Sequence, residues 1–190
     1  GFGSTFFLNT PTVLELVKWL KERYPHIPLV AGSQNHSMME LKMDWYIYGY
    51  GENAILALLD HFKGGPEPIH SGRMINCYVN YKSFPQDDLT VSYRDDDFIQ
   101  PREILLLEFA RGCKFKCKFC SFPVLGVKGD YSRTAQSVYD EMLRNYDKWG
   151  TEHYIVLDET FNDSSEKIEK FASVIEKLPF TPKMTAYIRA

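Results

Sequence analysis

Apolar and polar residues follow two alternating patterns along the front of the chain. Apolar or Phe- and Thr-rich runs over residues 2–8, 27–32 and 44–51 predict strands, and the continuous runs are typical of strands buried on both faces. Apolar residues at helical spacing predict helices over residues 10–24 and 52–62. The second helix is expected to share one apolar face among Ile55, Leu58, Leu59 and Phe62. This alternation predicts a parallel sheet covered by helices.

The alternation resumes after residue 101. Residues 103–110, 153–159 and 183–189 predict strands, and residues 133–150 and 164–178 predict helices. The back of the chain is therefore also predicted to be α/β, with too few strands to close a barrel. Because both chain ends lie next to a strand, we expect an internal piece of a longer protein.

The segment between these regions is rich in glycine, proline and clustered acidic residues, which are typical of loops and domain boundaries. It predicts a front domain over residues 1–66, a linker over residues 67–100 and a back domain over residues 101–190. Within the linker, residues 75–81 alternate enough to predict a short strand.

Composition and charge narrow the class of protein. Of 190 residues, 44% are hydrophobic, and the formal charge of −3 indicates no nucleic-acid partner. No apolar run is long enough to cross a membrane, and no leader opens the chain. Four cysteines are too few for a disulfide scaffold of this length. These features predict a cytoplasmic protein with reduced thiols and no membrane partner.

Three of the cysteines, Cys113, Cys117 and Cys120, lie within eight residues, directly after the predicted strand over 103–110. Thiolates are ligands for zinc, copper(I) and iron–sulfur clusters. A structural zinc site usually needs four ligands, and Cys77 is the one further cysteine. Three thiolates suit a 4Fe–4S cluster whose fourth iron is open. The carboxyl end of a parallel strand is the expected place for such a site.

This spacing resembles the radical SAM superfamily, in which three cysteines hold the cluster and Phe119 matches the aromatic residue before the last of them. The resemblance implies that the open iron binds S-adenosylmethionine (SAM). One electron from the cluster then cleaves SAM to a 5′-deoxyadenosyl radical. It also implies an enzyme that needs a reductant such as flavodoxin or ferredoxin and acts on an unidentified substrate.

The resemblance extends to further residues that would contact SAM. Asp158 and Glu159 stand at the end of the predicted strand over 153–159, where many family members carry an acidic residue for the SAM amino group. Arg133 precedes the helix after the cysteine loop, and Arg189 ends the predicted third strand. These four residues are the expected SAM contacts together with Phe119.

The front of the chain resembles the latter part of the cobalamin-binding domain that precedes many radical SAM barrels. The similar segments are "VAGSQNH" and "DWYIYGYGENAILALL". The expected fold is therefore a partial Rossmann-like, cobalamin-binding-type domain followed by the first part of a radical SAM (β/α) partial TIM barrel. Cobalamin is a further candidate cofactor, and methyl transfer is one of several reactions left open, with no catalytic residue assigned.

Other interpretations remain open for the same residues. The cysteines could form a zinc or dithiol site, and the chain could be a non-catalytic zinc- or cluster-binding interaction module. The acidic pair could begin the next helix, and either arginine could pair with a surface carboxylate. Cys77 is expected to be a free thiol.

Overall fold

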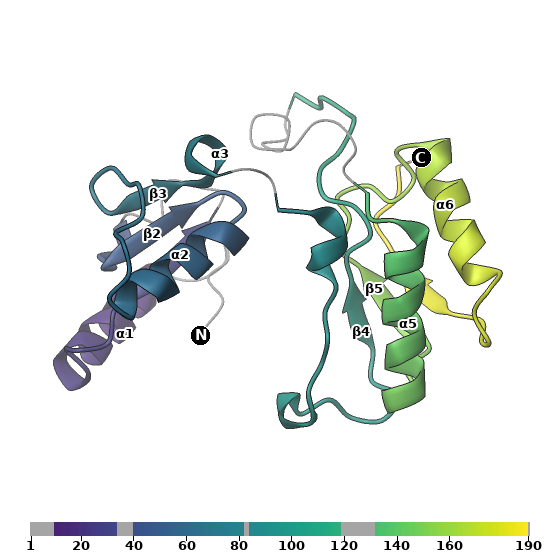
Figure 1. Ribbon diagram of the computed structural model, residues 1–190, viewed down its shortest axis with the longest axis horizontal. Helices are drawn as coiled ribbons and strands as arrows, with labels where there is room; N and C mark the ends of the chain where they lie inside the picture. Colours follow the sequence, from purple (N-terminus) through teal and green to yellow (C-terminus); the bar gives the residue numbers. More distant parts are fainter. Residues whose placement is uncertain (1–9, 34–39, 82–83, 119–131, 190) are drawn as a thin grey trace. The chain divides into compact units, whose positions relative to one another are not determined.

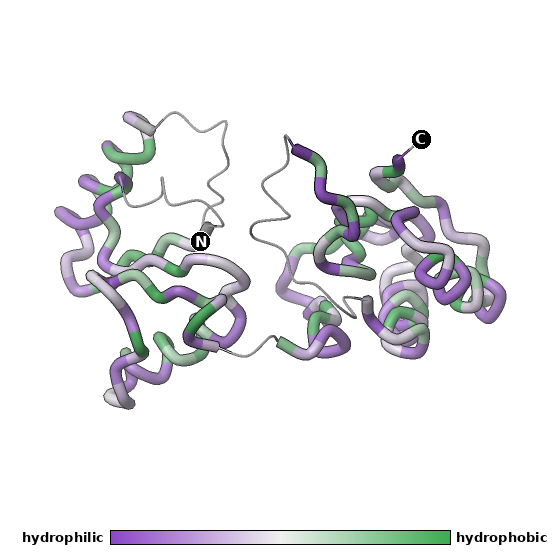
Figure 2. The backbone as a smooth tube through the Cα atoms, turned by 90° about the horizontal axis from the view of Figure 1, so that it is seen from above, coloured by the Kyte–Doolittle hydropathy of each residue, from purple (hydrophilic) through white to green (hydrophobic). Residues whose placement is uncertain are grey.

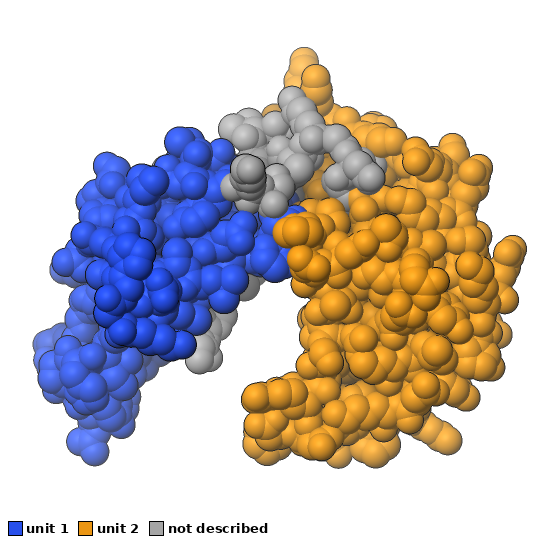
Figure 3. All heavy atoms as spheres, viewed as in Figure 1, with its two compact units in different colours: residues 1–84 blue, residues 85–190 orange. Residues whose placement is uncertain are grey.

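The computed structural model describes residues 10–33, 40–81, 84–118 and 132–189 (Figure 1). The chain divides into two compact units, residues 1–84 and residues 85–190, which Figure 3 shows in different colours. The strand predicted over residues 2–8 lies outside the described residues.

Unit 1 contains a three-stranded parallel sheet in the order β1-β2-β3. The strands are β1 (Val30–Ser33), β2 (Trp45–Tyr48) and β3 (Met74–Asn76). Helix α1 (Thr10–Arg23) precedes β1, and helix α2 (Glu52–Phe62) connects β2 to β3. Parallel neighbours require a crossover, which α2 supplies between β2 and β3.

Both faces of this sheet are buried, as the continuous apolar runs predict. On one face, Tyr46 of β2 packs in a cluster with Val13 and Val17 of α1. On the other face, Trp45 and Ile47 pack with residues of α2. Successive strand residues point to opposite faces, so β2 needs apolar residues at every position.

The predicted buried face of α2 is wrong in part. The structure buries Ala54 and Leu58 against the sheet, whereas Ile55, Leu59 and Phe62 are 37%, 47% and 39% exposed. Ala54 lies four residues before Leu58, so the two share a face. The apolar stripe of the helix is wider than the surface that the sheet covers.

The segment predicted as a linker is divided between the two units at residue 84. Strand β3 joins the sheet of unit 1, and the chain then turns into the short helix α3 (Cys77–Asn80). The strand expected over residues 75–81 therefore ends early, because the Asn76 side chain accepts a hydrogen bond from the backbone N–H of Tyr78 and caps a helix.

Unit 2 begins with two short 3₁₀ helices, Gln86–Leu89 and Asp95–Asp97. Its parallel sheet has the order β4-β5-β6, with β4 (Leu105–Leu107), β5 (His153–Val156) and β6 (Lys183–Thr185). Helices α5 (Ala135–Trp149) and α6 (Ser165–Ile175) follow β4 and β5. The predicted strands and helices of this region are thus all present, with shorter strands.

The two long helices of unit 2 pack on one face of its sheet. Leu105, Leu107 and Tyr154 form a cluster with Val138 of α5 and Phe171 of α6. Figure 2 shows hydrophobic and hydrophilic residues interspersed along the described backbone. The helix boundaries follow local signals: Thr134 and Ser164 cap the starts of α5 and α6, and Gly150 ends α5 in the left-handed conformation.

The described fold is mixed α/β, with two small parallel sheets. Among the described helices, none has the length and apolar character needed to span a membrane. The Rossmann-like assignment of unit 1 and the partial-barrel assignment of unit 2 go beyond this description and remain predictions.

Candidate cluster and cofactor site

The predicted site residues of unit 2 that the structure describes lie at or near the carboxyl ends of its parallel strands. Three described segments form this edge: the cysteine loop (residues 108–118) after β4, the acidic loop (residues 157–164) after β5, and residues 186–189 after β6. In parallel α/β folds this is the edge where ligands bind.

Two of the three predicted cluster ligands are described. Cys113 and Cys117 are free thiols and partly exposed. The Cys113 thiol donates to Thr160 Oγ1 at 3.5 Å, and Cys117 Sγ lies 3.9 Å from Arg189 Nη1. Cys120 and Phe119 lie outside the described residues. The described residues contain no group of three metal ligands.

Carboxylates of the acidic loop accept hydrogen bonds from backbone N–H groups of the cysteine loop. Asp158 Oδ1 accepts from Phe109 and from Ala110, each at 2.9 Å. Glu159 Oε2 accepts from Gly112 at 2.9 Å, and Asp163 Oδ2 accepts from the amide of Lys114 at 3.2 Å. These bonds place the cysteine loop directly beside the acidic loop.

The two adjacent acids differ in environment. Asp158 is 0% exposed, and its Oδ2 lies 3.2 Å from the ammonium nitrogen of Lys167. Burial raises the pKa of Asp158 and outweighs the lowering by the amide bonds and Lys167. Glu159 is only partly buried, and burial also raises its pKa, against the bond from Gly112. Glu159 thus retains access to solvent that Asp158 lacks.

Arg133 is buried and engaged within the protein. It is 1% exposed, and its Nη1 lies 2.8 Å from Glu141 Oε2. It also donates to the carbonyl oxygen of Glu108 at 3.0 Å. The predicted contact of Arg133 with SAM stays a prediction, and the structure gives the guanidinium a partner in α5.

Arg189 lies at the thiol edge of the site. Its guanidinium carbon is 4.2 Å from the centroid of the Phe115 ring, a cation–π contact. The Asn162 side chain accepts from the backbone N–H of Arg189 and donates to its carbonyl oxygen, both at 2.8 Å. The structure thus brings Arg189 close to Cys117, although β6 ends at Thr185, before Arg189. The contact of Arg189 with SAM stays a prediction.

Sequence reasoning missed three residues of this edge: Thr160, Asn162 and Lys167. The first two are polar residues directly after the strand-end acids, a signal that could have found them. Lys167 carries no comparable signal, because one lysine in a helix rich in lysine and glutamate is usually a surface residue.

The fourth cysteine has a different character. Cys77 lies buried in unit 1, and burial, with Glu52 nearby, raises its pKa to about 11. A thiol with such a pKa stays protonated at neutral pH and is a poor ligand and nucleophile. This environment is consistent with the expected free thiol.

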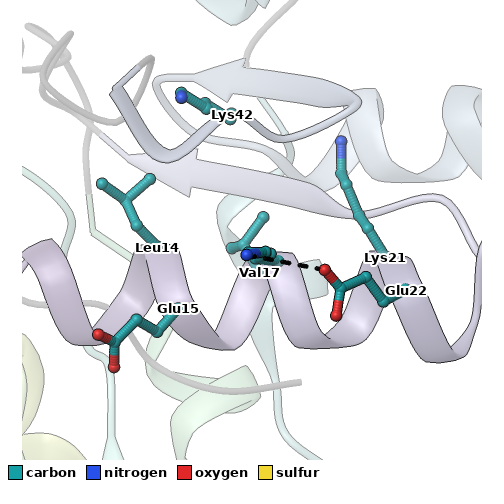
Figure 4. A pocket seen from close by; sticks show the side chains of 7 residues that line it. Leu14, Glu15, Val17, Lys21, Glu22 and Lys42 are labelled. Atoms are coloured by element: carbon teal, nitrogen blue, oxygen red, sulfur yellow. Dashed lines mark ion pairs between the residues drawn. The ribbon is translucent and has the colours of Figure 1, made fainter.

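Unit 1 also has a hollow of about 610 Å³, shown in Figure 4. Residues of α1, together with Lys42, line it: Leu14, Glu15, Val17, Lys18, Lys21 and Glu22. The Lys18–Glu22 ion pair of 3.9 Å is solvent-exposed. None of the predicted site residues lies there.

One known protein family matches the part of the chain that carries this site. Residues 107–188 match the radical SAM superfamily. The matched segment begins in β4 and includes the cysteine loop, the acidic loop and Arg133. No curated protein matches the chain.

The described donors suit an iron–sulfur cluster. Two reduced, partly exposed thiols stand on one loop, and sulfur is the usual ligand of such clusters. The Arg189 guanidinium lies 3.9 Å from Cys117 Sγ and marks the polar side of this loop. The match and the donor chemistry therefore agree. The match does not extend to unit 1, so the cobalamin-binding resemblance of that unit stays a prediction.

Proposed function

We propose that this protein is a radical SAM enzyme that cleaves SAM reductively, with a 4Fe–4S cluster held by Cys113, Cys117 and Cys120. The observation that carries this proposal is the pair of free thiols on the loop whose Gly112 amide binds Glu159, within a segment that matches the superfamily. When bound, the cluster would supply one electron to the sulfonium of SAM. The chain's own residues bind, orient and shield the reactants.

Glu159 is the better of the two acids for the SAM amino group. Both oxygens of Asp158 already face protein donors: two backbone amides on Oδ1 and the Lys167 ammonium near Oδ2. Glu159 is more accessible, and its bond to Gly112 holds it one residue from Cys113. A carboxylate there can accept from an ammonium group without leaving a buried charge unpaired.

Arg189 is the second candidate for SAM, through the SAM carboxylate. Its backbone is held by Asn162, and its guanidinium lies against Phe115 and near Cys117. A guanidinium binds a carboxylate through two parallel hydrogen bonds. Phe119 and Arg133 remain expected SAM contacts on the strength of the family resemblance.

Methyl transfer or another radical transformation, with cobalamin as a candidate second cofactor in unit 1, fits the resemblance of the front segment. An external one-electron donor such as flavodoxin or ferredoxin would supply the electron. The protein would act in the cytoplasm.

Anaerobic reconstitution with iron and sulfide, followed by dithionite and SAM, tests the proposal. The wild-type chain should gain broad absorption near 400 nm and release 5′-deoxyadenosine. Cys117→Ala should lose both, because a cluster needs its thiolate ligands. Cys77→Ala is the control and should retain both. Metal uptake without any SAM cleavage by the wild type would favour the non-catalytic module instead.

A further inference from the structure

We infer that Lys167, acting through Asp158 and Asp163, is a positioning residue that holds the cysteine loop in the conformation in which it binds the cluster. That this loop binds a cluster rests on the proposed function. The contacts of Lys167 join groups of this chain alone.

The Lys167 ammonium contacts three oxygen atoms of the acidic loop. It donates a hydrogen bond to the carbonyl oxygen of Thr160 at 2.7 Å. It also forms ion pairs with Asp158 Oδ2 at 3.2 Å and with Asp163 Oδ1 at 2.9 Å. The residue is only 3% exposed, whereas lysine is rarely buried without partners. Its burial therefore depends on this arrangement.

The two carboxylates reach the cysteine loop with their other oxygen atoms. Asp158 Oδ1 accepts the amides of Phe109 and Ala110, and Asp163 Oδ2 accepts the amide of Lys114. Each acid thus binds Lys167 with one oxygen and the cysteine loop with the other. The loop on both sides of Cys113 is tied to one buried ammonium group.

The charge balance explains why the loop is part of this arrangement. Two carboxylates face the Lys167 ammonium in a buried place. Backbone N–H groups of residues 109, 110 and 114 donate to the other oxygens of the same carboxylates. If Lys167 loses its charge, the carboxylates lose their main counter-charge and their fixed positions. The amide bonds to the loop should then weaken together.

Lys167→Met tests this inference, because methionine keeps an unbranched apolar chain and removes the ammonium. Amide hydrogen exchange is measured on the metal-free, reduced full-length chain. We expect exchange at residues 109, 110 and 114 to accelerate by about tenfold or more, as for loss of hydrogen bonds to charged groups. The amides of Leu107 and Val156 should change far less.

Glu141→Gln is the matched control, since it removes the charge of Glu141 in another buried ion pair of unit 2, Arg133–Glu141. Glu141 contacts Arg133, Thr90 and Val91 rather than the loop amides. This variant should be destabilised without selective exchange at residues 109–114. Equal acceleration throughout unit 2 in Lys167→Met, in proportion to lost stability, would overturn the inference.

Asp163→Ala keeps the test decisive if Lys167→Met does not fold. This variant should accelerate exchange at Lys114 selectively, and unchanged exchange there would also overturn the inference. Cluster loading gives a separate readout: Lys167→Met should take up less iron than Glu141→Gln. Failure of the wild type to cleave SAM would refute the proposed function, while the exchange result would still decide the role of Lys167.

Discussion

The side chains of Asp158 and Glu159 differ in solvent accessibility, and this difference assigns them different roles. Asp158 and Glu159 are neighbours in the sequence, but successive residues at a strand end point in different directions. Asp158 faces the interior and binds the backbone of the cysteine loop. Glu159 lies closer to solvent beside Gly112. The first is suited to holding the loop, and the second to holding a ligand.

Paired substitutions separate these two roles. Glu159→Gln should weaken SAM binding to the reconstituted protein by about tenfold or more, because a charged partner of the SAM amino group is lost. Its thermal stability should change little. Asp158→Asn should lower the free energy of unfolding by about 2 kcal/mol or more, because it breaks a buried, hydrogen-bonded ion pair. Equilibrium binding and urea denaturation measure the two effects, and the reverse pattern would exchange the assigned roles.

The raised pKa of Cys77 predicts slow alkylation of its thiol and a fall in protein stability at high pH. Because burial raises its pKa from 9.0 to about 11, iodoacetamide should modify it far more slowly at pH 8 than Cys113 and Cys117. The folded pKa lies above the unfolded value, so the folded state holds the proton more tightly. Stability should be unaffected below about pH 9 and should fall as pH rises from 9 to 11. Mass spectrometry after timed alkylation, and denaturation of Cys77→Ala, check both statements.

At the scale of helices and strands, strand β4, which leads into the site, is shorter than the sequence predicts. An apolar run over residues 103–110 predicts one strand, but β4 ends at Leu107. Phe109 and Ala110 are buried like strand residues, yet their amides bind Asp158 instead of a neighbouring strand. Hydropathy reports burial and not the hydrogen-bond partner, so the pattern could not reveal where the strand ends.

Arg133 and Glu141 connect the start of α5 to the rest of unit 2. Arg133→Met should lower the free energy of unfolding by about 3–5 kcal/mol, because it leaves the buried Glu141 carboxylate without its cation. The double variant Arg133→Met, Glu141→Leu should recover much of that loss. Urea denaturation of both variants and of Glu141→Leu gives the coupling energy, and purely additive effects would contradict a coupled pair.

Over the whole chain, each described hydrophobic cluster draws its residues from one unit. The composition of the middle segment indicates a boundary but not its position. Strand β3 completes the sheet of unit 1, whereas Thr90 and Val91 bind Glu141 of unit 2. Those pairings divide the predicted linker, and no local pattern encodes them.

Leu58→Ala tests the separate core of unit 1. Leu58 is fully buried, so its truncation should destabilise that unit by about 2–5 kcal/mol. Hydrogen exchange at Ile47 and Ile75 should accelerate first, while Val138 and Val156 of unit 2 respond less. Leu56→Ala, at a position that is 58% exposed, is the control and should cost much less. An equal response in both units would mean that they unfold as one.

Local pattern was enough to predict the alternation of strands and helices, the three-thiol loop and the acidic strand end. These features depend on residues a few positions apart, whose spacing sets backbone periodicity and ligand grouping. The tertiary structure decided the rest, through the parallel pairing of β4 with β5. This pairing buries Asp158, leaves Glu159 accessible and brings the acidic loop, with Lys167, beside the cysteine loop. The bond from Phe109 to Asp158 spans 49 residues of sequence, and such contacts arise only when the sheet aligns its strand ends.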